Sequence, residues 1–293
     1  MPPSPLESVE FTVKHYDLAV TFSCGQAFRW RKNGDAWEGV VGSRWVRLRQ
    51  SSSGISAEST SAGDWQWLRH YLQLDTELSD IVATFPDDDA MRAAAAYCRG
   101  MRLLRQDPWE TLASFICSST KQVAQIQQIV DLLCQRFGER LDAGDKSIDA
   151  YAFPAAARIA EASEAELREC KLGFRAPYLL GTACAVASGK ISLPQLSQLS
   201  LTEAREALVE LPGVGLKIAD CVLLFAYGFP QAFPVDVWIA RALREIYFPK
   251  RRPKPPRLRK FIETYFGPHS GYAQQYLFHY MRTTTPRSRR LRR

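Results

Sequence analysis

The feature that most constrains the fold is a change of hydrophobic period near residue 64. Residues 10–50 alternate apolar and polar side chains around two tight-turn sequences, a pattern that predicts strands. Residues 51–63 are rich in Ser and Gly, and we expect a loop there. Beyond this point apolar residues recur at helical spacing. The sequence therefore predicts an α+β fold, with a small antiparallel β-sheet domain over residues 1–104 and a mostly helical domain over residues 105–293.

Several capping signals place helix starts within the second domain. Asp107 followed by Pro108 predicts one start, and Ser163 with Glu166 forms a capping-box sequence at another. Thr202 is the expected cap of a third helix. Further helices are expected over 175–188, 216–228, 236–247, 256–266 and 270–281.

The composition excludes several classes of protein. The seven cysteines are widely spaced without a C-x-x-C pair, which argues against zinc ribbons and iron–sulfur clusters. No apolar run approaches the ~20 residues of a membrane span. The N-terminal segment lacks the basic and apolar regions of a secretory signal. We therefore expect an intracellular monomer, in the cytoplasm or nucleoid of a prokaryote or the nucleus of a eukaryote, without a membrane partner.

Basic residues are concentrated near the C-terminus. Residues 250–260 and 282–293 contain 13 of the 38 basic residues and no acid, so the rest of the chain, with 25 basic and 31 acidic residues, is negatively charged. This distribution suits a surface that meets a polyanion such as DNA. A solubilising loop and tail remain the alternative.

The segment LPGVGLK, residues 211–217, joins two helical patterns. Gly213 and Gly215 favour a tight turn, and the next helix begins directly after it. The turn and the first-turn amides of that helix, including that of Ile218, would face a phosphate. The two glycines alone fit a structural helix–helix turn equally well.

Two chemically reactive residues lie at the start of the helix after this turn and at the start of the following helix. Lys217 lies in its first turn, where the helix dipole disfavours a cation, so that the neutral, nucleophilic amine is more available. Asp236, directly after Pro234-Val235, is the expected N-cap of the following helix, where backbone amides would keep its carboxylate ionised. Each residue alone also fits a surface lysine or a plain helix cap.

Together, L-P-G-V-G-x-K and P-V-D at this spacing resemble the helix–hairpin–helix DNA glycosylase superfamily. The resemblance implies that the hairpin binds DNA phosphates, that Lys217 attacks the sugar C1′, and that Asp236 assists. The lysine resembles the bifunctional glycosylase/lyase branch. Further matches point to the 8-oxoguanine DNA glycosylases, at residues 23–30, 101–108, 115–119, 171–176 and 273–278. The implied function is base flipping and excision of 8-oxoguanine from double-stranded DNA through a lysine Schiff base, without a required cofactor.

Spacing alone groups the residues of a pocket. Lys217, Cys221 and Phe225 lie at i, i+4 and i+8 on one helix, and Gln274 and Phe278 are four residues apart on another. Simple core packing is the alternative for both phenylalanines. A buried glutamine is harder to explain without a polar partner.

The resemblance assigns roles to these residues. The carbonyl of Gly25 would accept N7–H of the oxidised base, a hydrogen that normal guanine lacks. Cys221 and Phe278 would sandwich the flipped base, and Gln274 would bind its Watson–Crick edge. The family's hairpin can also hold a structural cation through backbone carbonyls, and these would be the carbonyls of the residues Val209, Leu211 and Val214.

The chain departs from the family where the opposite strand is read. Thr120 stands where eukaryotic members have asparagine beside the orphaned cytosine, and Gln125 replaces a cytosine-reading arginine. Phe174 replaces a wedging tyrosine, whereas Arg175 matches the second cytosine-reading arginine. Trp238 replaces a histidine. These departures bear on opposite-base selectivity and on the rate of chemistry more than on the choice of lesion.

Two rival functions stay open at this point. One is a helix–hairpin–helix glycosylase for another oxidised base, such as a thymine-glycol enzyme, although the cysteine cluster of that type is missing. The other is a non-catalytic DNA-binding module, which would need neither Lys217 nor Asp236.

Overall fold

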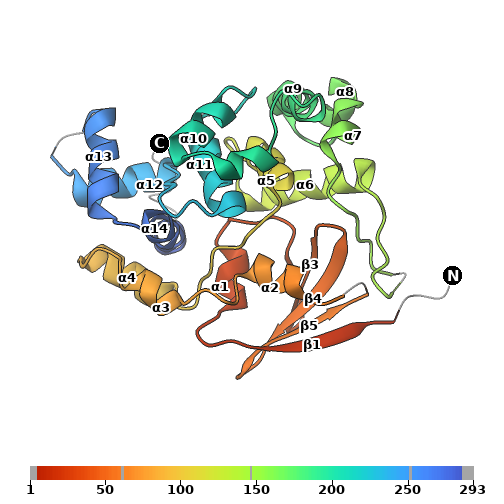
Figure 1. The fold of residues 1–293 in the computed structure, drawn as a ribbon, viewed down its shortest axis with the longest axis horizontal. Coiled ribbons are helices and arrows are strands. Elements are labelled where there is room, and N and C mark those ends of the chain that lie inside the picture. Colours follow the sequence, from red (N-terminus) through yellow and green to blue (C-terminus); the bar gives the residue numbers. More distant parts are fainter. Residues whose placement is uncertain (1–4, 61–62, 146, 251–252, 286–293) are drawn as a thin grey trace.

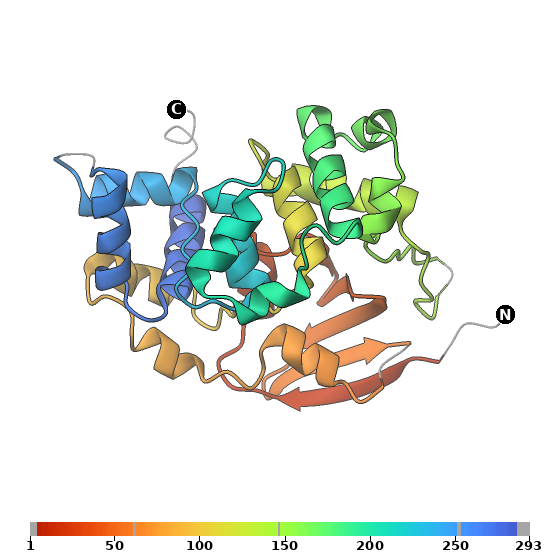
Figure 2. The same ribbon diagram turned by 45° about the horizontal axis from the view of Figure 1, so that its top comes forward.

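The computed structural model describes residues 5–60, 63–145, 147–250 and 253–285 (Figure 1). The predicted α+β fold is confirmed: a five-stranded antiparallel sheet occupies one side of the molecule, and helices make up the rest (Figures 1 and 2). Among the described residues, no helix is long and apolar enough to cross a membrane. Residues 251–252 and 286–293, which carry part of the predicted basic surface, lie outside the described residues. The boundary between residues 104 and 105 stays a prediction.

The strand order in the sheet is β1-β5-β4-β3-β2, and all neighbours are antiparallel. The two predicted tight turns join β2 to β3 and β3 to β4. The expected loop over 51–63 was wrong, because it contains β5, in which the buried Ile55 and Ala57 alternate with more exposed residues. Ser59, a polar residue on the buried face, and the surrounding serines and glycine concealed the period of this strand. The strands are β1 Glu7–Thr12, β2 Arg31–Asn33, β3 Ala36–Val41, β4 Arg44–Gln50 and β5 Gly54–Ser59.

The helices follow the predicted pattern closely. Asp107 and Ser163 cap their helices as expected. The cap at Thr202 was wrong: Ser200 caps this helix, because Glu203 completes a capping box with it. The helices are α1 Leu18–Ser23, α2 Gln66–Leu72, α3 Leu78–Val82, α4 Asp89–Tyr97, α5 Pro108–Cys117, α6 Val123–Phe137, α7 Ala156–Ala160, α8 Glu164–Glu169, η1 Gly173–Arg175, α9 Ala176–Ala187, η2 Pro194–Gln198, α10 Leu201–Val209, α11 Leu216–Val222, η3 Leu223–Tyr227, α12 Val237–Ala242, η4 Leu243–Tyr247, α13 Pro255–Tyr265 and α14 Ser270–Thr284.

The last helix connects the two parts of the chain. Although α14 lies near the C-terminus, Tyr276 donates its hydroxyl to the carbonyl of Met101 (2.8 Å), and Gln275 donates to the carbonyl of Cys24 (3.0 Å). Both side chains are buried. The helix therefore fixes the loop after α1 against the helical domain, and this loop contains Gly25.

Candidate active site

The hairpin between α10 and α11 has the geometry that its glycines predict. Gly213 has φ +75°, and a Cβ there would lie only 2.6 Å from Cβ of Tyr178, so glycine is required both by the backbone and by packing. Gly215 is the N-cap of α11, where no side chain caps the helix. The side chain of Ile218 is buried, so only its backbone could face DNA.

The predicted cation ligands are close together in this turn. The carbonyl of Leu211 accepts the amide of Val214 at 3.1 Å, and a carbonyl oxygen retains a second lone pair. A cation at the carbonyls of Val209, Leu211 and Val214 stays a prediction. In the part of the chain that the structure describes, no three His, Cys, Asp or Glu side chains are arranged to hold a metal.

Lys217 lies where α11 meets α5. Its Nζ donates to Oγ of Ser118, 3.1 Å away, and lies 4.8 Å from the ring centroid of Phe115. Phe225 is buried and stacks on Phe115, with 5.6 Å between the two ring centroids. This contact favours core packing for Phe225. Ser118 was missed as a partner of the lysine, although it lies within the family-like segment 115–119.

Asp236 caps α12 as predicted. Its Oδ1 accepts the amides of Trp238 (3.0 Å) and Ile239 (2.9 Å). Burial nevertheless raises the pKa of Asp236, and these amides and the charge of Lys217 only partly oppose that effect. Desolvation is therefore the larger effect on this carboxyl group, and the amides that were expected to keep it ionised offset burial only in part. Burial also raises the pKa of Cys221 to about 12, so its thiol is neutral at pH 7.

In the loop around Gly25, the carbonyls on either side of this glycine accept hydrogen bonds from side chains. The carbonyl of Cys24 accepts Nε2 of Gln275 (3.0 Å), and that of Gln26 accepts Nε2 of Gln106 (2.8 Å). No described residue donates to the carbonyl of Gly25. With φ +84°, Gly25 also has a backbone conformation that side chains disfavour.

Gln274 provides a second such acceptor. Its side chain is 2% exposed, and its Nε2 donates to the carbonyl of Pro234 at 2.9 Å, two residues before Asp236. Its Oε1 is buried without a partner among the described residues. Phe278 lies one turn further along α14, and its Cε1 would be 3.5 Å from a Cβ on Gly25. The structure thus brings Phe278 beside Gly25, with Gln274 one turn away on the same helix, and we call these three residues the lesion pocket.

Three of the predicted DNA-binding residues form a second group, which we call the opposite-strand corner: Thr120, Phe174 and Arg175. Arg175 donates to the hydroxyl of Thr120 (2.7 Å) and to the carbonyls of Ser119 and Leu172. Its guanidinium carbon lies 4.2 Å from the ring centroid of Phe174, which is 56% exposed. The arginine itself is 3% exposed, so it stands behind the phenylalanine.

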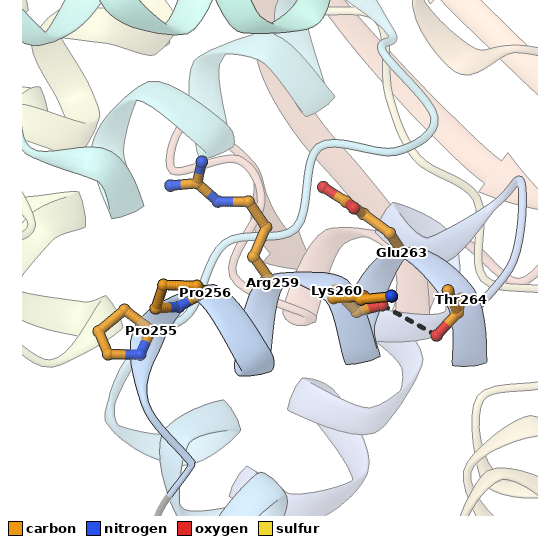
Figure 3. Close-up of a pocket in the computed structure, with 6 residues that line it drawn as sticks. All are labelled: Pro255, Pro256, Arg259, Lys260, Glu263 and Thr264. Atoms are coloured by element: carbon orange, nitrogen blue, oxygen red, sulfur yellow. Dashed lines mark hydrogen bonds between the residues drawn. The ribbon is translucent and has the colours of Figure 1, made fainter.

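A separate hollow of about 450 Å³ lies along α13. Figure 3 shows its lining, which comes entirely from this helix and includes Arg259 and Lys260. None of its lining residues belongs to the lesion pocket or the opposite-strand corner. The hollow is therefore distinct from the candidate active site.

Comparisons with known proteins agree with this geometry. A family model described as "8-oxoguanine DNA glycosylase, N-terminal domain" matches residues 8–112, and one described as "HhH-GPD superfamily base excision DNA repair protein" matches residues 113–268. The N-glycosylase/DNA lyase OGG1 of Arabidopsis thaliana is 32% identical to this chain over 289 residues, which cover 92% of this chain and 78% of that protein.

Two solved structures are similar over nearly the whole chain. A structure of MBOgg1 in complex with a low-affinity DNA ligand has 34% identity and a TM-score of 0.88, and the match covers 94% of this chain and 95% of that one. The Clostridium acetobutylicum 8-oxoguanine glycosylase/lyase, in complex with double-stranded DNA containing cytosine opposite 8-oxoguanine, has 29% identity and a TM-score of 0.87, covering 96% and 99%. The chain therefore belongs to the helix–hairpin–helix superfamily of base excision DNA repair proteins and, within it, to the 8-oxoguanine DNA glycosylase family.

Proposed function

We propose that the protein is a bifunctional DNA N-glycosylase and abasic-site lyase that excises 8-oxoguanine from double-stranded DNA. Similar proteins named above are N-glycosylases/DNA lyases, and one was solved with a duplex containing 8-oxoguanine. The damaged nucleotide is rotated out of the duplex, because its glycosidic bond cannot be reached within the stack.

The observation that carries this proposal is the pair of acceptors without donors in the lesion pocket. The carbonyl of the partly buried Gly25 can accept a hydrogen bond, and the buried Oε1 of Gln274 has no donor among the described residues. 8-Oxoguanine has donors on both edges, N7–H on one and N1–H with the exocyclic amine on the other. Guanine lacks N7–H, so it would leave the Gly25 carbonyl unsatisfied. The two acceptors therefore favour the oxidised base.

Apolar contacts complete the proposed pocket. Phe278 offers an aromatic face, and Cys221 is buried on α11 one turn after Lys217. Because the Cys221 thiol stays neutral, it can lie against a base without presenting a charge. A base held between these side chains has its sugar near the lysine.

The proposed chemistry begins at the amine of Lys217. Its neutral Nζ forms a bond to C1′ as the bond from C1′ to the base breaks, and the base leaves with the electron pair and then takes up a proton. Asp236 stabilises the cationic sugar. Loss of a proton from Nζ and opening of the sugar ring give a Schiff base, and β-elimination then breaks the C3′–O bond. Ser118 positions the amine before attack.

DNA binding is expected to be dominated by phosphates and to weaken with salt. The amides of the hairpin, at Gly213, Gly215 and Ile218, are the proposed contacts. Phe174 is exposed enough to stack against the gap left by the flipped nucleotide. All of these groups come from one chain, so we propose that it acts as a monomer. None of the steps transfers electrons to a redox cofactor.

Borohydride trapping tests the proposal. A duplex with 8-oxoguanine opposite cytosine should give a covalent protein–DNA adduct, whereas the same duplex with guanine should give none. Binding without trapping, even on an abasic duplex, would identify a non-catalytic module. Trapping with thymine glycol but not with 8-oxoguanine would identify a glycosylase for another base.

A further inference from the structure

Arg282 lies at the edge of the lesion pocket, although nothing in the sequence motifs marks it. It follows Phe278 by one turn and Gln274 by two, on the same face of α14. Its guanidinium carbon lies 5.2 Å from the ring centroid of Phe278. Its Nη1 would be 3.0 Å from a Cβ on Gly25. The guanidinium therefore borders both Gly25 and the aromatic face.

Two neighbouring groups position this guanidinium. Nη2 donates to the carbonyl of Ser23, and Nδ1 of His279 lies 3.4 Å from the same nitrogen. Burial, and secondarily the charge of Arg282, lower the pKa of His279 to about 4. The imidazole is therefore neutral at pH 7 and can accept a hydrogen bond. These two contacts are made at Nη2, and Nη1 is the nitrogen beside Gly25.

We propose that Arg282 is a specificity-determining residue that donates from Nη1 to the oxygen at C8 of the damaged base. The inference rests on the proposed function, because it assumes that the Gly25 carbonyl accepts N7–H. Oxidation adds a hydrogen at N7 and an oxygen at the adjacent C8. A base that places N7–H on the Gly25 carbonyl must place O8 beside Gly25, the residue that Nη1 of Arg282 borders. Guanine offers only a C–H bond at this position.

The same contact assists departure of the base. When the bond to C1′ breaks, the electron pair passes to the base and its negative charge spreads onto O8. A fixed cation at O8 stabilises this charge as it develops, which lowers the barrier to excision. The charge of Arg282 also lowers the pKa of Asp236, against the larger opposing effect of burial, so the guanidinium is electrostatically close to the proposed reaction centre. Arg282 therefore acts on lesion choice and on rate.

Single-turnover kinetics on two substrates test this assignment. We compare Arg282→Met with the wild type on 8-oxoguanine opposite cytosine and on an abasic duplex, which places no base in the pocket. Excision of 8-oxoguanine should slow by about 10- to 100-fold, the effect of one hydrogen bond to a charged group. Trapping on the abasic duplex should stay within about 2-fold. Arg282→Lys should show an intermediate loss, because lysine keeps the positive charge but lacks the planar guanidinium with its several N–H donors.

The matched control is Arg168→Met on α8, an exposed arginine that pairs with Glu164. It should leave both rates unchanged. Single-turnover rate constants do not depend on the fraction of folded enzyme, so partial misfolding of a variant does not obscure the result. An equal loss on both substrates with a shallower salt dependence would assign Arg282 to a phosphate and overturn the proposal. Faster excision by Arg282→Met would overturn it too, as the mark of a side chain that obstructs the pocket. Failure of the wild type itself to excise 8-oxoguanine would instead refute the proposed function.

Discussion

The lesion pocket and the opposite-strand corner differ in how their polar groups are satisfied. In the pocket, the Gly25 carbonyl and Oε1 of Gln274 have no donor among the described residues. In the corner, Nη1 and Nη2 of Arg175 already bind Thr120 and backbone carbonyls of the chain itself, and only its Nε is buried without a partner among the described residues. An acceptor without a donor favours a complementary ligand, whereas Nη1 and Nη2 of Arg175 must give up a bond to contact a base. We therefore expect sharper discrimination of the lesion than of the base opposite it.

Gln125 extends this contrast. Its Oε1 accepts the amide of Gln122 at 3.0 Å, where it completes a capping box at the start of α6. The residue that stands in place of a cytosine-reading arginine therefore serves as a helix cap. The opposite-strand corner is built from groups that stabilise the protein itself.

The largest expected effect comes from a substitution that removes the chemical step and leaves both regions intact. Lys217→Gln should abolish adduct formation because it removes the proposed nucleophile, while lesion binding stays near that of the wild type. Borohydride trapping and a binding assay on the same duplex measure the two properties. Lys190→Gln, which changes an exposed lysine far along the chain from the motif, is the control. A trapped complex with Lys217→Gln would mean that another amine is the nucleophile.

Asp236→Asn should lower turnover by about 100-fold or more, since the carboxylate would no longer stabilise the cationic sugar. Asparagine can still cap α12, so the fold should persist. Burial raises the pKa of Asp236, and catalysis needs the ionised form, so wild-type activity should fall on the acid side at a pH above the ordinary value of about 3.9. The residual activity of the variant should not show this decrease at low pH. A near-normal rate would make Asp236 a structural cap only.

The raised pKa also fixes the sign of the effect on stability. The folded protein retains the proton of Asp236 more strongly than the unfolded chain does. Stability from this group is therefore fully present below the unfolded pKa of about 3.9 and is lost as the pH rises through the folded pKa. At neutral pH the replacement by asparagine should not destabilise the protein, which thermal unfolding at pH 5 and pH 8 would check.

Gly25→Leu tests the lesion pocket directly. A Cβ at this position would lie 3.0 Å from Nη1 of Arg282, and the backbone has φ +84°, so a larger side chain must disturb the pocket. The rate of 8-oxoguanine excision should fall by about 5- to 150-fold, the range for the loss of one hydrogen bond that leaves an unsatisfied acceptor. Trapping on an abasic duplex should persist. Equal failure on both substrates would indicate damage to folding or DNA binding instead.

These residues also show how far sequence reasoning reaches. Lys217, Asp236 and the hairpin glycines were found because local rules for helix starts and tight turns apply to them, and the structure places them as expected. Local rules missed β5, because its serines obscure the alternation of apolar and polar residues. They also missed the raised pKa of Asp236, which depends on burial by distant segments. Arg282 was missed for the same reason, since only the packing of α14 against the loop after α1 brings it to Gly25. Local sequence patterns do not predict burial by, or contacts with, segments that are distant in the sequence.

The opposite base should matter less than the lesion. Because Arg175 is bound to the chain itself and Gln125 caps α6, we expect the excision rates opposite the four bases to differ by less than about 10-fold, or one well-formed hydrogen bond. Single-turnover rates with 8-oxoguanine opposite each base measure this. A preference of 100-fold for cytosine would show that DNA binding releases Arg175 from Thr120, and it would remove the contrast between the two regions.

The smallest expected effect concerns the backbone of the corner. Thr120 has φ +60°, where a β-branched residue is strained and asparagine is tolerated. Asparagine also keeps an oxygen that can accept Nη2 of Arg175. Thr120→Asn should therefore raise the melting temperature by about 2 °C, with little change in excision. Thr120→Ser, which removes the branch but not the preference against this conformation, should lie between the two. A lower melting temperature for Thr120→Asn would mean that the bond from Arg175 to the threonine hydroxyl outweighs the strain, and the corner would then depend on threonine itself rather than on any short polar residue.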